Sequence, residues 1–212
     1  MTKRYFDAVV IVPLEEEFET ALSHFQIVEN LSTKTQIRFA ATVPNSDLTI
    51  LLIKQNGMGK TENQNAAHMA LADFDAGSLI CLGIAGGLSN DVNIGDVCYT
   101  GSIFDLHDNA KATDADLAFS PKTYETPLEL AIAINLDRVN PETKPGHEAW
   151  RDAQEKIAKS AISGKFLGKR KELEEIQRPT VREGAIACGA VSDSPEYNKK
   201  VKDVDRRMLA HI

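Results

Sequence analysis

Apolar residues occur in short continuous runs that alternate with segments of helical spacing. The run FDAVVIVPL (6–14) is typical of a strand that is buried on both faces of a sheet. In the segment EEEFETALSHF (15–25), Phe18, Leu22 and Phe25 share one face of a predicted helix. Further predicted strands are IRFAATV (37–43), LTILLIK (48–54), SLICLGIAGGL (78–88), GDVCYTGSIF (95–104) and GAIACGAV (184–191). This alternation predicts a single α/β domain over residues 1–212, with a twisted mixed sheet flanked by helices.

The pattern of the remaining segments predicts helices, turns and one long polar loop. Pro44-Asn45-Ser46-Asp47 predicts a hairpin-like turn between two of the strands, and the polar residues 105–125 predict a loop. Further predicted helices run from about Lys60 to Phe74, over 126–136 and over the charged segments 147–162 and 168–178, and a last helix begins near Ser194. No internal repeat or linker interrupts this pattern.

Charge and composition narrow the class of protein. The formal net charge of -7 argues against nucleic acid as a partner, since such proteins usually carry a basic surface. No apolar run approaches the roughly 20 residues of a membrane span, and the start does not resemble a signal peptide. Cys81, Cys98 and Cys188 are far apart and form no CxxC pair, which gives a metal site little support. We therefore expect a cytoplasmic protein that needs no metal or organic cofactor.

Residues 56–70, NGMGKTENQNAAHMA, contain Gly59-Lys60-Thr61, which looks like the end of a phosphate-binding P-loop. A P-loop needs another glycine five positions before Gly59, where this chain has Lys54 at the end of a predicted strand. A dinucleotide fingerprint fails as well, because position 62 is Glu62 rather than glycine. Gly57 and Gly59 therefore form either a plain strand-to-helix turn or a turn whose backbone N–H groups face a polar ligand.

Three stretches in order give a more specific signal. VVIVPLEEEFETAL, QNGMGKTENQNAAHMAL and LICLGIAGGLSNDVNIGDV resemble the first strand, the glycine turn with its helix, and the GxAGGL…GDV region of the nucleoside phosphorylase and nucleosidase superfamily. GAIACGAVSDS stands where that family has its base-contacting strand, whereas residues 105–183 show no clear match. The resemblance implies the family's α/β fold and cleavage of the N-glycosidic bond of a purine nucleoside or nucleotide.

The resemblance also implies roles for individual residues. Glu17, the third residue of a glutamate triplet, aligns with the nucleosidase glutamate that orients and deprotonates the attacking water. An acidic first turn that favours the helix dipole is the competing interpretation for Glu17 and fully explains Glu15 and Glu16. The resemblance places the backbone of Ala85, Gly86 and Gly87 near the sugar or the nucleophile.

Two positions depart from the family pattern. Ile84 stands where relatives often carry a Ser or Thr that helps to bind phosphate or water. Because Glu17 would also repel a phosphate, the pattern favours hydrolysis by a nucleosidase over phosphorolysis, a glycosyltransferase reaction that would add phosphate as a partner. Ser192 and Asp193 stand where nucleosidases place an aromatic residue against the base. They are candidate base contacts, although a helix N-cap explains Asp193 or Ser194 equally well. His107 and Asp108 read as a solvated loop pair.

The family pattern normally continues beyond the point where this sequence stops. A glutamate strand that grips the ribose hydroxyls and a later aspartate that protonates the purine would follow Ile212, so the resemblance predicts a chain cut short at its C-terminus. The resemblance leaves open whether the chain is active as it stands. The missing strands would leave an unpaired sheet edge, and in this family the pocket usually lies near a dimer interface. Both points predict a homo-oligomer. Two alternatives stay open: a non-catalytic nucleoside- or nucleotide-sensing module, and a nucleotide-degrading effector domain. The latter would use the basic residues Lys165, Lys169, Arg170 and Lys171.

Overall fold

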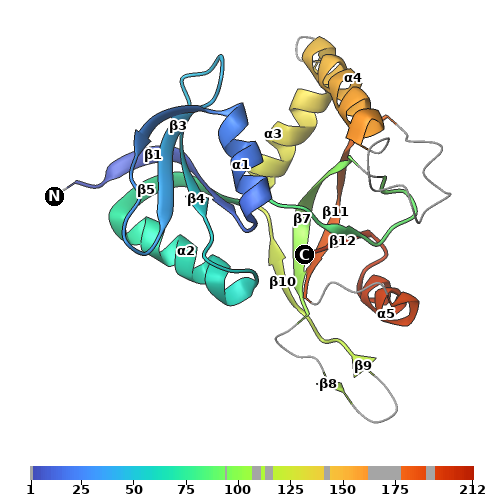
Figure 1. The fold of residues 1–212 in the computed structure, drawn as a ribbon. Helices are drawn as coiled ribbons and strands as arrows, with labels where there is room; N and C mark the ends of the chain where they lie inside the picture. The colour runs from blue at the N-terminus through green and yellow to red at the C-terminus, as the bar shows by residue number, and fades with distance from the viewer. Residues whose placement is uncertain are drawn as a thin grey trace. The chain divides into compact units, whose positions relative to one another are not determined.

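A computed structural model describes residues 2–93, 95–106, 111–112, 117–140, 144–161, 178–189 and 194–212 of the chain. The chain divides into two compact units, Met1–Ile84 and Ala85–Ile212, each with a sheet and a core of its own (Figure 1). The predicted α/β class with mixed sheets flanked by helices is confirmed. The described strands form two five-stranded sheets and one two-stranded sheet, where the sequence pattern predicted a single sheet.

The first unit contains a mixed five-stranded sheet and two helices. In spatial order its strands are β2 (Gln26–Asn30), β3 (Ile37–Thr42), β4 (Thr49–Lys54), β1 (Arg4–Val12) and β5 (Phe74–Cys81). The strands β4, β1 and β5 are parallel, with β5 at the edge of the sheet, and β2 and β3 are antiparallel to their neighbours. The predicted turn between β3 and β4 is confirmed, and Asn45 adopts the left-handed conformation (φ 60°) that asparagine tolerates.

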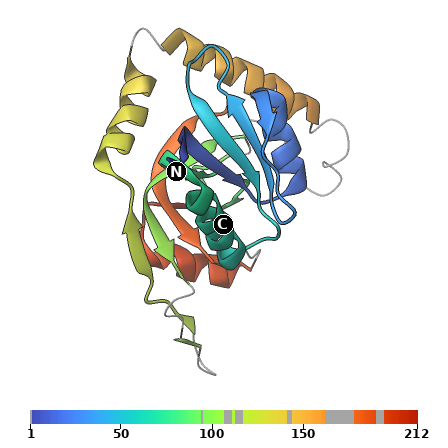
Figure 2. The same ribbon diagram turned by 90° about the vertical axis from the view of Figure 1, so that its left-hand side faces the viewer.

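Both faces of the central strand β1 are buried, which accounts for its uninterrupted apolar sequence. Val9 and Ile11 pack with Ala66 and Ala70 of α2 (Lys60–Asp73) on one face. Val10 and Val12 pack with Phe18 and Ala21 of α1 (Glu15–His24) on the other face. The helices therefore cover opposite faces of the sheet, as Figure 2 shows in a second view.

The second unit is built on another mixed sheet. In spatial order its strands are β10 (Lys122–Glu125), β7 (Val97–Asp105), β11 (Val181–Cys188), β12 (Met208–His211) and β6 (Gly86–Gly87). Helices α3 (Leu128–Val139), α4 (Lys144–Ala161) and α5 (Pro195–Val204) and the short pair β8 (Lys111–Ala112) and β9 (Leu117–Ala118) complete this unit. Its core joins Ala185 and Ala187 of β11 to Val201 of α5 and Met208 of β12.

Several boundaries differ from the sequence-based expectation. Phe74 starts β5 rather than ending α2, and Phe6 packs edge-on against it with ring centroids 5.4 Å apart. The segment 105–125, expected as a loop, contains β10, which pairs with β7. The strands β2 and β12 were not predicted, because each is short. The C-terminal helix ends at Val204, where Asp205 caps it in an extended conformation. None of the described helices combines the length and apolar character that crossing a lipid bilayer requires.

His211 in β12 gives the stability of the second unit a predictable pH dependence. Its side chain is 3% exposed, and Nδ1 has no hydrogen-bond partner among the described groups. Burial lowers the pKa of His211 below its usual 6.5, so the unfolded chain binds the proton more readily. Stability should therefore be complete above about pH 6.5 and fall as the pH decreases through the window below that value. Melting temperatures measured between pH 7.5 and 5 should fall more steeply for the wild type than for His211→Phe; parallel curves would contradict this.

Candidate functional site

The side chain of Glu17 joins the ends of two neighbouring parallel strands in the first unit. Glu17 is the third residue of α1, and its Oε2 accepts a hydrogen bond from the Leu14 N–H that follows β1 (3.0 Å). Its Oε1 accepts a hydrogen bond from the Ile84 N–H that follows β5 (2.7 Å). The carboxylate thus receives one N–H on each oxygen at the carboxyl-terminal edge of the sheet, where α/β folds commonly bind ligands.

Only the third glutamate of the triplet is placed in this way. Glu16 is exposed. The carboxylate of Glu15 is also exposed and lies 3.9 Å from Nζ of the partly buried Lys54, at the outer limit of an ion pair. The hydrogen bond that Glu17 accepts from the Leu14 N–H is also a helix-capping contact. A purely structural role at the start of the helix therefore explains one of the two contacts of Glu17. The bond to Ile84 lies outside the helix and is not needed for capping.

Gly83 makes room for the Glu17 carboxylate. A Cβ atom at this position would lie 3.3 Å from Glu17 Oε2 and 3.3 Å from Pro13 Cδ, closer than nearly all observed Cβ contacts. The next residue, Ile84, lacks the hydroxyl that relatives often carry, and it meets Glu17 through its backbone N–H instead. The first glycine of the GIAGG stretch is therefore explained by the approach of a carboxylate.

The Gly57–Gly59 turn follows β4 at the same edge of the sheet. Gly59 has φ +98° and is the N-cap of α2, a conformation that strains any residue with a side chain. The amide of Gln55, which is 1% exposed, donates to the carbonyl oxygens of Gly57 and Gly59. Sequence reasoning missed Gln55; the only available signal was a polar residue between a fully buried strand and a glycine turn.

Asn63 and Cys81 lie beside this turn. Asn63 Nδ2 is 3.2 Å from Gln55 Oε1 and 3.3 Å from Cys81 Sγ. Desolvation raises the pKa of the Cys81 thiol, the Asn63 hydrogen bond opposes that shift, and the nearby negative charge of Glu17 adds to it. With its pKa raised, the thiol is protonated at neutral pH, so Cys81 is a poor nucleophile.

The other predicted site residues do not belong to the first unit or lie outside the described residues. Ala85, Gly86 and Gly87 begin the second unit, where β6 pairs with β12 (Gly86 with His211, Gly87 with Ala210). Outside the described residues lie Ser192, Asp193, His107, Asp108, Lys165, Lys169, Arg170 and Lys171.

Asp96, the aspartate of the GDV motif, has a structural role in the second unit. Its side chain is fully buried and forms an ion pair with Arg182 Nε. It also accepts hydrogen bonds from the N–H groups of Asn93 (2.9 Å) and Thr180 (2.8 Å). The motif therefore fastens the loop before β7 to the segment that leads into β11.

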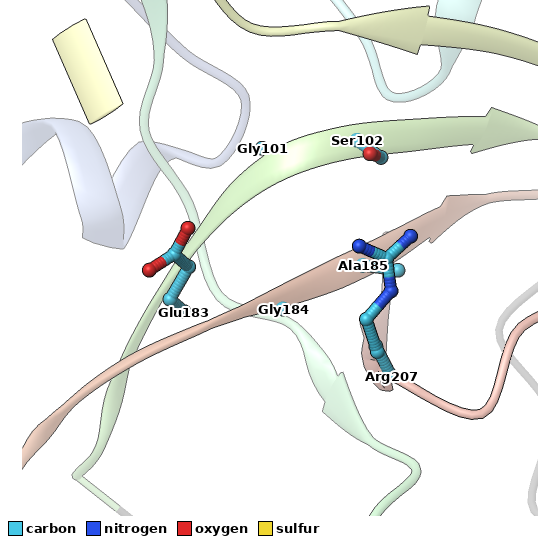
Figure 3. Close-up of a pocket in the computed structure, with 6 residues that line it drawn as sticks. All are labelled: Gly101, Ser102, Glu183, Gly184, Ala185 and Arg207. Atoms are coloured by element: carbon cyan, nitrogen blue, oxygen red, sulfur yellow. The ribbon is translucent and has the colours of Figure 1, made fainter. Parts of the chain in front are cut away.

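A hollow of about 180 Å³ lies on the second sheet, where Glu183 and Arg207 stand beside Gly101, Ser102, Gly184 and Ala185 (Figure 3). Glu183 Oε2 accepts hydrogen bonds from Tyr99 Oη (3.2 Å) and Asn135 Nδ2 (3.0 Å). Arg207 Nη2 pairs with Asp205 Oδ2 at 2.8 Å, which raises the pKa of Arg207 and lowers that of Asp205. The hollow contains none of the predicted site residues.

We call the carboxyl-terminal edge of the first sheet, where Glu17 lies, the Glu17 edge. Its carboxylate is held by two backbone N–H donors and lies against Gly83. Such a group can orient a water molecule and accept a proton from it. Among the described residues, no cluster of three or more His, Cys, Asp or Glu side chains could hold a metal ion.

Comparison with known proteins agrees with the resemblance seen in the sequence. The family model described as the phosphorylase superfamily matches residues 7–205. Similar solved structures include a 5′-methylthioadenosine/S-adenosylhomocysteine nucleosidase from Neisseria meningitidis in complex with methylthio-immucillin-A (TM-score 0.63, 17% identity, 97% of this chain and 74% of that one). Another is the Colwellia psychrerythraea nucleosidase in complex with adenine (TM-score 0.64, 14% identity, 100% and 74%). A third is Helicobacter pylori futalosine hydrolase (TM-score 0.58, 15% identity, 98% and 76%).

At these identities the solved structures establish the fold, and no curated protein sequence matches this chain. The predicted phosphorylase/nucleosidase-like fold is thus confirmed by the structures, and the predicted family is confirmed by the family model. Since the match extends over most of its length, the chain belongs to the phosphorylase superfamily.

Proposed function

We propose that the Glu17 edge belongs to a site that hydrolyses the N-glycosidic bond of a purine nucleoside or nucleotide. The observation that carries this proposal is the Glu17 carboxylate, held between Leu14 N–H and Ile84 N–H at the ends of β1 and β5. Each carboxylate oxygen uses one lone pair for these bonds and keeps another for a water molecule.

In the proposed reaction Glu17 acts as a general base. The oxygen of a bound water attacks C1′ of the sugar while the carboxylate takes one of the water's protons. The electron pair of the broken C1′–N bond passes to the purine, which takes up a proton from a general acid. We propose substrate contacts for the turn glycines Gly57 and Gly59 and for the backbone of Ala85, Gly86 and Gly87. Ser192 and Asp193 remain proposed base contacts.

Two considerations favour water over phosphate as the nucleophile. A phosphate anion at this position would meet the negative charge of Glu17, which costs energy in a partly desolvated site. The similar structures from Neisseria and Colwellia are named as nucleosidases and contain a nucleoside analogue and adenine, which supports a purine substrate here by analogy. From the sequence and its family resemblance we also propose a cytoplasmic homo-oligomer.

A panel of substrates tests the substrate class. We expect chromatography to detect free purine base when the protein is incubated with adenosine, methylthioadenosine, inosine or ATP. The preferred member of the panel identifies the base and the 5′ group. Absence of base from every member, together with ligand binding by calorimetry, would contradict the enzymatic proposal and favour a sensing module.

A further inference from the structure

We propose that Gln55 and Asn63 are positioning residues that hold the Gly57–Gly59 turn and couple it to the end of β5, beside Glu17. This inference rests on the proposed function, since it deepens the account of the same edge of the first unit. It concerns side chains that the family resemblance did not identify.

The first step of the argument is the burial of the Gln55 amide. Gln55 directly follows β4, and its backbone N–H continues the sheet by donating to Val12 O (2.9 Å). Its side chain is almost completely buried, and a buried amide is costly unless its polar atoms are paired. Nε2 donates to Gly57 O and to Gly59 O (3.2 Å), and Oε1 accepts from Asn63 Nδ2 (3.2 Å). All three bonds concern the turn or the first turns of α2.

The second step is the direction of the turn's N–H groups. The described peptide bonds are all trans, so each N–H points opposite to the carbonyl of the preceding residue. Because Gln55 draws the Gly57 carbonyl toward the protein interior, the N–H group of Met58 points away from it. The Met58 N–H makes no hydrogen bond with any described residue. Gln55 therefore presents the Met58 N–H on the outer side of the turn, where a substrate would approach.

The third step is the connection to β5. Asn63 Nδ2 lies 3.3 Å from Sγ of Cys81, which is the last residue of β5 before the Leu82–Ile84 segment. Leu82 N–H donates to Ile11 O (2.9 Å), and Ile84 N–H donates to Glu17. Asparagine inside a helix is intrinsically less favourable than alanine, and these contacts offset that cost at position 63. The side-chain amide of Asn63 thus links Gln55 and the glycine turn to the end of β5, which leads to the Ile84 N–H that binds the Glu17 carboxylate.

Asn63→Ala tests the coupling, with Asn65→Ala as the matched control. Both changes replace asparagine by alanine in α2, and Asn65 is exposed and forms no side-chain hydrogen bond with any described residue. We expect Asn63→Ala to accelerate amide hydrogen exchange roughly fivefold in two peptides, one covering residues 55–60 and the other covering residues 81–85. The melting temperature should stay unchanged. Asn65→Ala should leave both peptides unchanged. Exchange equal to wild type in either peptide of Asn63→Ala would overturn the coupling.

Kinetics then separates positioning from mere structural support. We expect Asn63→Ala to lower kcat/KM for base release about tenfold, mainly through KM, because misplaced binding groups weaken substrate alignment. Faster exchange with unchanged kcat/KM would show that the coupling does not position the substrate and would overturn the proposal. If the wild type releases no base, the exchange result still decides the coupling, and the hydrolytic function alone fails.

Discussion

Glu17→Gln should abolish most base release while leaving the fold intact. The substitution keeps the length of the side chain and removes its capacity to accept a proton, which typically costs a general-base reaction roughly 10²- to 10⁴-fold. The oxygen of the glutamine amide can still accept one of the two hydrogen bonds that the N–H groups of Leu14 and Ile84 donate. The measurement is kcat/KM for base release from the best substrate of the panel, with the melting temperature recorded in parallel.

Glu16→Gln is the matched control, because Glu16 has the same side chain one position earlier and is exposed. Its activity should equal that of the wild type. A residual activity of Glu17→Gln close to wild type would exclude Glu17 as the general base and leave the strand-end contact as a purely structural feature. Equal losses in both variants would indicate an effect of the acidic helix start as a whole.

Gly184→Ala should strongly destabilise the second unit. A Cβ atom on Gly184 would overlap Leu209 Cγ and would lie 2.7 Å from the backbone oxygen of Arg207. The backbone of β12 cannot move away without breaking its pairing with β11, in which Ala185 lies opposite Met208. We expect a loss of at least about 2 kcal/mol in the free energy of unfolding, or a melting temperature lower by about 4–8 °C.

Gly101→Ala on the neighbouring strand β7 is the control for this effect. A Cβ at Gly101 meets nothing closer than Glu183 Oε1 at 4.0 Å, so the alanine fits. Its stability should equal or slightly exceed that of the wild type, since alanine restricts the unfolded chain. Similar losses in both variants would contradict the packing of β12 against β11.

The parts of the fold that could be predicted are those whose sequence pattern depends on burial alone. The run 6–14 was correctly interpreted because β1 is covered by α1 on one face and α2 on the other. The hairpin of β3 and β4 followed from its turn residues. The strand β12 could not be predicted, because four residues after a helix carry too little periodicity and its partner β11 lies far away in sequence.

The candidate site shows a similar division. Glu17 was proposed from the family resemblance, and Gly57 and Gly59 were proposed from a local glycine pattern between a predicted strand and a predicted helix. Gln55, Asn63 and Cys81 were missed, since the two contacts that join them span eight and eighteen sequence positions. The requirement for Gly83 likewise depends on the approach of Glu17 from another element, and no local pattern encodes that approach.

The most direct test of the account is base release in phosphate-free buffer, with the sugar product identified by mass spectrometry. The account predicts free purine and free sugar at a rate that added phosphate does not increase. Base release that requires phosphate and yields a sugar 1-phosphate would contradict hydrolysis and the role of Glu17 in activating water.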